Sequence, residues 1–248
     1  DTLLAALGDE RPRALLLTHI HLDHAGASGT LVERWPGLEV YVLERGAPHM
    51  ADPARLIDSA RRLYGDDMDR LWGDFLAVPE ANLHVLTGGE TLPGGFEVAY
   101  TPGHASHHVS YLHEGTAYVG DVGGVRIPSS PFVLPPTPPP DIDIEAWHSS
   151  VDLIAAWHPE RLAMTHFGAV EDTAAHHEEM HRRLDEQAEL ARSGDRDAFL
   201  ERVSRDVAAA GDPETAAAYT QAAPQDQLFA GLSRYWRKRS EAVGPPLS

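Results

Sequence analysis

The sequence predicts an α/β protein, a layered core of strands and helices followed by a helical C-terminal region. In the first two thirds of the 248 residues, short apolar runs alternate with segments of helical periodicity. Glycine and proline turns separate these segments, and from Asp172 onward the chain is rich in Ala, Glu and Arg. Strands separated by helices imply sheets that are covered by helices.

The expected elements of the N-terminal part begin with an apolar run, ALLLT, that fits a buried strand. A short helix follows and ends at Pro36-Gly37, where a helix cannot readily continue. Apolar residues then recur at helical spacing among Arg and Asp, which predicts one or two helices. We expect strands at 14–18, 38–43 and 83–86, and helices at 26–35 and within 54–75.

The rest of the core is expected to hold strands at 96–100, 109–112 and 117–119, the last two forming a hairpin that turns at Glu114-Gly115. The proline-rich segment 123–141 reads as a stiff extended loop rather than a packed element. A helix at 143–157 and a strand at 161–165 follow, and helices from 172 onward break near Gly194 and 211–213. No internal repeat is present.

Composition excludes several classes of function. Twenty basic against thirty-eight acidic residues give a formal net charge of −18, and Lys238 is the only lysine, so we expect no nucleic-acid partner. No apolar run approaches the ~20 residues that span a bilayer, and residues 1–13 lack the layout of a signal peptide. The expectation is a cytoplasmic protein without a membrane partner. Without cysteine, a site must use other ligands and nucleophiles.

The strongest motif is H-x-H-x-D-H, which directly follows the first predicted strand. It consists of His19, His21, Asp23 and His24. Residues two apart in an extended chain share a face, so His19 and His21 can converge on one ion, and a turn after Leu22 aims the other two at a second point. Imidazole and carboxylate groups suit Zn²⁺ or similar metals. The alternative interpretation is an exposed histidine-rich turn.

Three later residues stand in the same setting, a predicted strand end followed by a turn. They are His104 in YTPGHASHH, Asp121 in YVGDVGG and His166 in MTHFG. Strand ends at one edge of a layered sheet are where α/β proteins place their sites. Taken with the first motif, these side chains supply the donors that two metal ions need.

With these motifs in place, residues 13–168 resemble the metallo-β-lactamase superfamily, whose fold is an αββα sandwich of two sheets flanked by helices. The resemblance implies that His19, His21 and His104 bind a first metal ion. It further implies that Asp23, His24 and His166 bind a second ion and that Asp121 bridges both. A hydroxide held between two divalent cations would then be the nucleophile, with Asp23 or Asp121 moving the proton. Zn²⁺ is the expected metal, with Fe and Mn as alternatives.

Two departures from the family pattern stand out. Only residues 1–13 precede the motif strand, so the family's N-terminal hairpin is missing or trimmed. Glyoxalase II-type thioesterases read Gly-His-Thr at the third histidine, whereas this chain reads Gly103-His104-Ala105. The expected domains are a catalytic domain at 1–170 and a C-terminal helical region at 171–248.

Other branches of the family fit less well. The best-known β-lactamase subclass needs a cysteine, flavodiiron proteins place Glu at the position of His21, and nucleases need a basic path. What remains is a hydrolase of a small thioester, lactone or other ester. The alternatives are a non-catalytic, metal-stabilised binding protein and a persulfide dioxygenase with one iron.

Residues outside the ligand set have competing interpretations. His107 is a candidate substrate contact because it lies just beyond His104. Arg126, Phe132 and Val133 are further candidates because the 123–141 loop starts two residues after Asp121; the alternative for this loop is a stiff surface segment. The helical tail also allows a homodimer. The remaining histidines are either structural or, for those in the tail, a solvated helix face or an extra metal site; they are His49, His84, His113, His148, His158, His176, His177 and His181.

Overall fold

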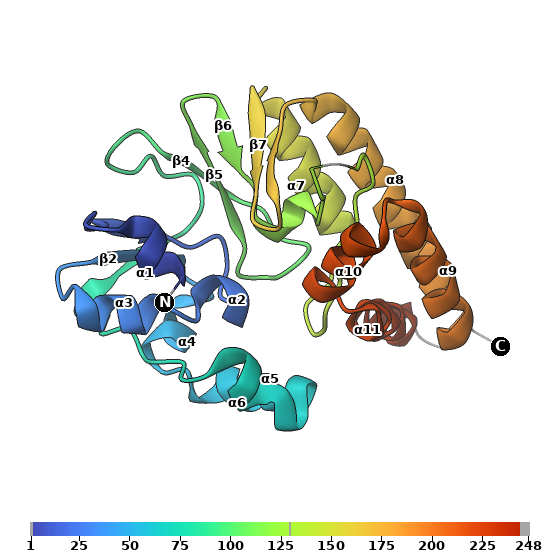
Figure 1. Ribbon diagram of the computed structural model, residues 1–248, viewed down its shortest axis with the longest axis horizontal. Coiled ribbons are helices and arrows are strands. Elements are labelled where there is room, and N and C mark those ends of the chain that lie inside the picture. Colours follow the sequence, from blue (N-terminus) through green and yellow to red (C-terminus); the bar gives the residue numbers. More distant parts are fainter. Residues whose placement is uncertain (1, 129, 244–248) are drawn as a thin grey trace. The chain divides into compact units, whose positions relative to one another are not determined.

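A computed structural model describes residues 2–128 and 130–243, and the chain divides into two compact units (Figure 1). Unit 1 is Asp1–Gly88 and unit 2 is Gly89–Ser248. The expected domain boundary at 170 therefore lies inside unit 2. The expected helical region reached residue 248, and its last five residues lie outside the described residues.

Unit 1 is built on a parallel sheet of order β1-β2-β3, formed by Ala14–Leu16, Glu39–Leu43 and Leu83–Leu86. Parallel neighbours need a crossover connection, and helices provide it here. The crossovers carry α2 (Leu22–Ala25), α3 (Ser28–Arg34), α4 (Ala47–Ala51), α5 (Ala54–Tyr64) and α6 (Met68–Trp72), while α1 (Thr2–Leu7) precedes the sheet. The expected strands and the longer helices of this half are present, with ends shifted by a few residues. The short helices α1, α2 and α4 were not predicted.

The core of unit 1 forms around the central strand β2. Val40 and Val42 are fully buried, and they belong to one apolar cluster with Leu31 and Val32 of α3 and Met50 of α4. A run such as VYVL is buried because β2 has a strand on each side and helices pack on the sheet. This packing fixes the carboxyl end of β1, which leads directly into the histidine motif.

Unit 2 contains a mixed sheet of order β4-β5-β6-β7-β8. Hairpins join β4 (Glu97–Tyr100), β5 (Val109–His113) and β6 (Thr116–Tyr118), and β6 runs parallel to β7 (Arg161–Met164). The crossover between them contains the 3₁₀ turn η3 (Gly120–Gly123) and helix α7 (Ile144–Ala156). Strand β8 (Gly168–Val170), which pairs antiparallel with β7, was not predicted because its three residues carry no periodic signal.

The tail of unit 2 is helical, as predicted, with α8 (Thr173–Arg192), α9 (Arg196–Ala209), α10 (Pro213–Ala222) and α11 (Gln225–Val243). Aspartate caps α8, α9 and α10, because a carboxylate oxygen accepts a hydrogen bond from a backbone N–H of each first turn. Gly194 and Gly211 lie in the breaks that the sequence indicated. A further break at Ala223-Pro224 was missed.

The C-terminal helices belong to unit 2 because they share one apolar core with its sheet. Leu162 of β7, Trp147 of α7, Met180 of α8, Phe199 of α9 and Tyr219 of α10 lie in the same buried cluster. Figure 1 shows α7 and α8 packed side by side near β7. A division of the chain at 170 would cut through this core.

The proline-rich loop 123–141 is packed, whereas its composition predicted a stiff extended loop that does not pack. Residue 129 of this loop lies outside the described part. Its Val125 and Leu134 form a β-bridge, and the Tyr219 hydroxyl donates to the Phe132 carbonyl at 2.7 Å. The Thr137 hydroxyl donates to the Leu228 carbonyl of α11. The Tyr219 hydroxyl of α10 thus satisfies loop backbone that a proline-rich segment cannot pair internally, and the hydroxyl of Thr137 in turn satisfies a backbone carbonyl of α11.

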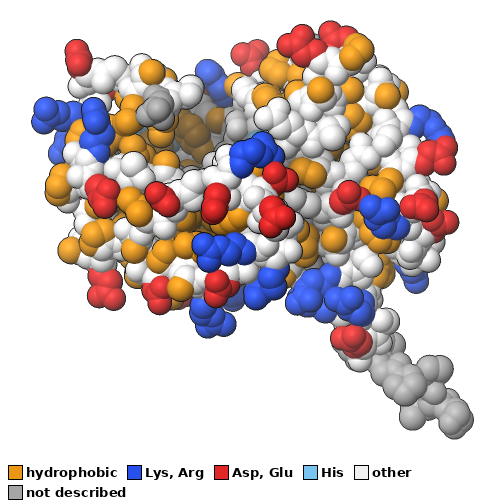
Figure 2. Space-filling model, turned by 60° about the horizontal axis from the view of Figure 1, so that its bottom comes forward, with side chains coloured by type: hydrophobic (Ala, Val, Ile, Leu, Met, Phe, Trp, Pro, Cys, Tyr) orange, Lys and Arg blue, Asp and Glu red, His pale blue; other side chains and the backbone are white. Residues whose placement is uncertain are grey.

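Within residues 2–128 and 130–243, no helix combines the length and apolar character needed to cross a membrane. On the face drawn in Figure 2, Arg and Lys side chains lie between Asp and Glu side chains instead of forming one continuous basic patch. A net charge of −18 agrees with such a surface.

Candidate metal-binding site

The histidine motif of unit 1 occupies the turn between β1 and α2. His19 follows the strand and is fully buried, and His21 has extended backbone angles and caps the helix. Asp23 and His24 lie within the single turn of α2, so the chain changes direction after His21. The turn expected in this segment is therefore present, one residue earlier than predicted.

The side chains of this turn gather into one cluster. The ring of His19 lies 4.7 Å from that of His21 and 4.0 Å from that of His24, measured between centroids. The Asp23 carboxylate is 3.2 Å from His24 Nε2. Unit 1 therefore brings together all four residues of the H-x-H-x-D-H motif.

The expected ligands of unit 2 come from three separate connections. His104 lies between β4 and β5, Asp121 is in the η3 turn after β6, and His166 follows β7. His104 and Asp121 are 1% and 4% exposed. Because β5, β6 and β7 are neighbours in the sheet, the segments at their ends meet, and the structure brings these three side chains together.

Asp121 presents its two oxygens to different histidines. Oδ2 lies 3.4 Å from Nε2 of His104, and Oδ1 lies 3.4 Å from Nε2 of His166. The Thr165 hydroxyl donates a hydrogen bond of 2.9 Å to Oδ1, which fixes the rotation of the carboxylate. Sequence reasoning missed Thr165, although its position next to His166 was a usable signal.

The tautomer of His104 shows that these groups suit a cation. Nδ1 of His104 is 2.8 Å from the Pro136 carbonyl, which only accepts, so Nδ1 carries the hydrogen and donates. In the neutral ring, Nε2 then directs a lone pair toward the Asp121 carboxylate. Such an arrangement is favourable when a positive charge, either a metal ion or a proton on Nε2, lies between the two atoms. A backbone carbonyl that fixes the outer nitrogen is a common partner of metal-bound histidine.

Gly103 and Trp147 hold the ligand group of unit 2, His104, Asp121 and His166, in place. Gly103 has φ +135°, and a Cβ there would lie 2.4 Å from backbone and side-chain atoms of Trp147, so only glycine fits between His104 and α7. The Trp147 indole donates to the Val122 carbonyl of the η3 turn at 2.9 Å and contacts the His104 ring edge-on. Trp147 thus supports the turn that carries Asp121.

The candidate substrate contacts Arg126 and Phe132 lie against the C-terminal helices. Arg126 contacts Nδ1 of His176 at 3.2 Å and donates to the Ser130 carbonyl, while Nε2 of His176 donates to the Gly123 carbonyl. Burial lowers the pKa of His176 to about 4, so its ring is neutral and its Nδ1 accepts from Arg126. His176 therefore has a structural role, holding the start of the 123–141 loop.

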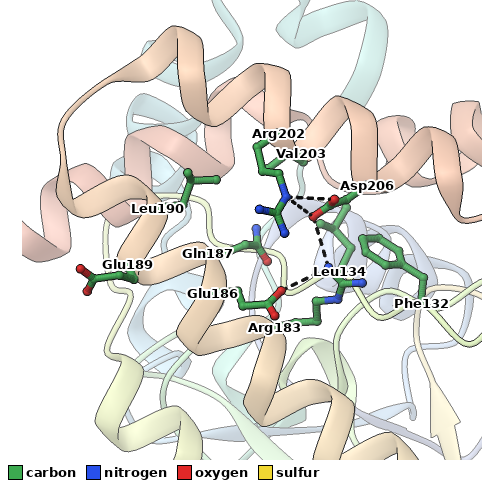
Figure 3. A pocket seen from close by; sticks show the side chains of 10 residues that line it. All are labelled: Phe132, Leu134, Arg183, Glu186, Gln187, Glu189, Leu190, Arg202, Val203 and Asp206. Atoms are coloured by element: carbon green, nitrogen blue, oxygen red, sulfur yellow. Dashed lines mark hydrogen bonds and ion pairs between the residues drawn. The ribbon is translucent and has the colours of Figure 1, made fainter.

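Cavities of unit 2 lie between this loop and helices α8 and α9. A cavity of about 430 Å³ is lined by Phe132, Arg183, Gln187 and Asp206, among others (Figure 3), and a neighbouring one of about 520 Å³ reaches Arg126. Arg183 pairs with Asp206 and stacks over the Phe132 ring. In the described part of the chain, the linings of these two cavities include none of the seven expected metal ligands.

The other two candidate substrate contacts, His107 and Val133, differ in how deeply they are buried. His107 is half-buried in the same connection as His104, whereas Val133 is fully buried in the core of unit 2 and packs there. Neighbouring His108 is buried, and its Nδ1 lies 2.9 Å from the hydroxyl of Thr101, which also contacts Ser110. His108 thus joins β5 to the end of β4.

Known proteins are similar to parts of this chain. Metallo-beta-lactamase fold-containing protein ST1585 of Sulfurisphaera tokodaii is 28% identical over 165 residues, which cover 63% of this chain and 60% of the relative. A hydroxyacylglutathione hydrolase of Xylella fastidiosa is 34% identical over 110 residues, 44% of this chain and 32% of the relative. The chain therefore spans less than two thirds of the length of either relative.

Solved structures extend the likeness to the fold. TTHA1623, solved in a di-iron-bound form, is 28% identical with a TM-score of 0.51, covering 68% of this chain and 78% of that one. The family protein TTHA1429 from Thermus thermophilus has a TM-score of 0.64 at 23% identity and covers 99% of this chain and 82% of its own. These likenesses confirm the expected fold class, an α/β metallo-β-lactamase fold with a C-terminal helical region. A family model described as the metallo-beta-lactamase superfamily matches residues 2–166, and the chain belongs to that family.

Proposed function

We propose that this protein is a metal-dependent hydrolase that uses a pair of divalent cations to cleave a small thioester, lactone or other ester. The observation that carries the proposal is the Asp121 carboxylate, whose oxygens lie 3.4 Å from two different histidines. One oxygen for each of two cations is what a bridging carboxylate requires. Family membership and a relative named hydroxyacylglutathione hydrolase support the reaction class.

The proposed ligand sets follow the family pattern. His19, His21 and His104 would hold one cation, Asp23, His24 and His166 the other, and Asp121 both. This donor set of imidazole nitrogens and carboxylate oxygens suits Zn²⁺, Fe or Mn, and the related TTHA1623 was solved in a di-iron-bound form. When bound, such a pair lowers the pKa of a water and polarises a carbonyl.

The residues around the proposed cations orient the ligands, accept the proton of the attacking water and contact the substrate. The Thr165 hydroxyl orients the carboxylate of Asp121, and the Pro136 carbonyl accepts from Nδ1 of His104, so that Nε2 of this ring faces Asp121. Asp23, whose side chain is partly exposed, or Asp121 takes the proton of the attacking water at a carboxylate oxygen. We propose His107 as a substrate contact because it shares the connection of His104, and Arg126 and Phe132 as more distant contacts.

The test is a panel of thioesters, lactones and simple esters, offered to the full chain reconstituted with Zn²⁺, Fe²⁺ or Mn²⁺. We expect turnover of at least one class, about two metal equivalents bound by the seven proposed ligands, and no turnover by Asp121→Ala at unchanged secondary structure. Hydrolysis by Asp121→Ala at the wild-type rate would refute the role of this residue. Metal retention without hydrolysis would indicate a binding protein, and oxygen uptake with a persulfide would indicate the single-iron dioxygenase.

A further inference from the structure

Helices α7 and α8 carry a second group of histidines, separate from the expected ligands. His148 of α7 faces His181 of α8, and the two Nδ1 atoms are 2.5 Å apart. The ring planes are within 9° of parallel and the centroids are 4.9 Å apart, so the rings meet nitrogen to nitrogen. The two helices pack side by side in unit 2 (Figure 1).

Each ring is backed by a carboxylate from the opposite helix. Nε2 of His148 lies 2.9 Å from Asp185 of α8, and Nε2 of His181 lies 3.1 Å from Asp152 of α7. A carboxylate accepts, so both Nε2 atoms carry hydrogen and donate. In the neutral rings, both Nδ1 atoms therefore direct lone pairs at one another.

Two facing lone pairs at 2.5 Å repel each other unless a proton or a metal cation lies between them. The arrangement is the one found around metal-bound histidine, where the outer nitrogen of each ring donates to a carboxylate. The side chains of His148 and His181 are 25% and 30% exposed, so a cation can reach them and complete its shell with water. Because the rings lie near the surface, they can separate by the fraction of an ångström that ligands on a common ion need.

We propose that His148 and His181 form a transition-metal site that links α7 to α8, with Asp152 and Asp185 orienting the two rings. Two imidazole nitrogens fit borderline cations such as Zn²⁺, Ni²⁺ and Cu²⁺ and not Mg²⁺ or Ca²⁺, which prefer oxygen ligands. The spacing of four residues in His148–Asp152 and His181–Asp185 places each pair on one helix face. The site is independent of the proposed hydrolase centre.

A third histidine of α8, His177, lies near the pair. It precedes His181 by one helical turn, and burial lowers its pKa, so it stays neutral beside the pair. Its Nε2 is buried and has no hydrogen-bond partner among the described residues. His177→Gln is therefore a useful probe of whether the site extends along α8.

The experiment is a Zn²⁺ titration of the full chain, followed by ¹⁵N NMR of the histidine rings. Assignments come from His148→Asn and His181→Asn. We expect the Nδ1 resonances of both rings to shift together on Zn²⁺ binding, and each variant to lose one equivalent of Zn²⁺. The matched control His158→Asn, at a left-handed position that Asn tolerates, keeps the wild-type stoichiometry.

The orienting carboxylates give a second readout. Asp185→Asn should weaken Zn²⁺ binding at this site by about 10–100-fold, as the loss of a partner of a metal-bound histidine does. Unshifted Nδ1 resonances at saturating Zn²⁺ would overturn the proposal and assign the contact to a shared proton. Equal Zn²⁺ uptake by wild type, His148→Asn and His181→Asn would overturn it as well.

Discussion

Six consecutive positions, 19 to 24, supply the ligand group of unit 1, whereas the group of unit 2 comes from three connections between positions 104 and 166. The first group is held by one turn between a strand and a short helix. The second exists only because β5, β6 and β7 are paired and α7 packs beneath them. We infer that damage to the core of unit 2 disperses the second group, while the first depends mainly on its local backbone.

The largest expected effect is that of Gly103→Ala. The new methyl group would overlap Trp147 at 2.4 Å and the backbone would hold a non-glycine residue at φ +135°, which together cost about 4 kcal/mol of unfolding free energy. Chemical denaturation of the metal-free protein measures this loss. The control Gly37→Ala in unit 1, where no described atom lies within 4 Å of the added Cβ, should lose far less. Equal stability of the two variants would contradict the close packing of Gly103.

Histidine truncation compares the two ligand groups directly. His104→Ala empties a buried site and leaves the Pro136 carbonyl without its donor, so the metal-free protein should lose about 3 kcal/mol. His21→Ala removes a partly exposed ring and should cost less than about 1 kcal/mol. Urea denaturation in the presence of a metal chelator measures the loss of unfolding free energy in each variant. If His21→Ala lowers the unfolding free energy more than His104→Ala does, the inferred difference between the two ligand groups is wrong.

The third prediction concerns the pH dependence of unit 2. Burial lowers the pKa of His176 to about 4, against 6.5 for an ordinary histidine. Between these values the unfolded chain binds a proton that the folded chain does not, so stability falls as pH decreases from 6.5 to 4 and is fully present above 6.5. The pKa difference corresponds to roughly 3 kcal/mol. Unfolding free energies measured from about pH 7.5 to about pH 4.5 should fall less steeply in His176→Gln than in the wild type, and equal slopes would contradict a neutral, buried His176.

The smallest expected effect is that of Thr165→Val, which removes the hydroxyl that orients Asp121. Metal affinity or turnover should fall by about 10–100-fold without loss of fold. Thr165→Ser keeps the hydroxyl and should restore most of the loss. Metal competition assays measure the affinity, and wild-type affinity in Thr165→Val would show that the contact does not position the carboxylate.

Much of the fold followed from local patterns. Apolar runs located β1, β2 and β3, helical periodicity located α7, and an Ala-, Glu- and Arg-rich composition with breaks near Gly194 and 211–213 indicated α8 to α10. The sequence did not indicate β8, whose three residues pair only because β7 lies beside them. The packing of 123–141 was also missed, since proline content describes a chain's stiffness and not the partners that α10 and α11 provide.

The candidate site likewise has a part that local sequence predicted and a part that depends on tertiary contacts. The motif at positions 19–24 was evident from spacing alone, because side-chain direction in a short extended segment is a local property. The contacts of Asp121 with His104, His166 and Thr165, and the pairing of His148 with His181, join residues far apart in the chain.

The sequence by itself determined the alternation of strands and helices, the identity of the candidate ligands and the exclusion of cysteine chemistry, since these depend on residue types and on spacing within a few positions. Only the tertiary structure decided which oxygen of Asp121 meets which histidine, that the C-terminal helices share the core of unit 2, and that His148 and His181 face each other. The reason is physical. Local backbone preferences act over one or two turns, whereas strand pairing and helix packing choose partners by burying apolar surface from the whole unit.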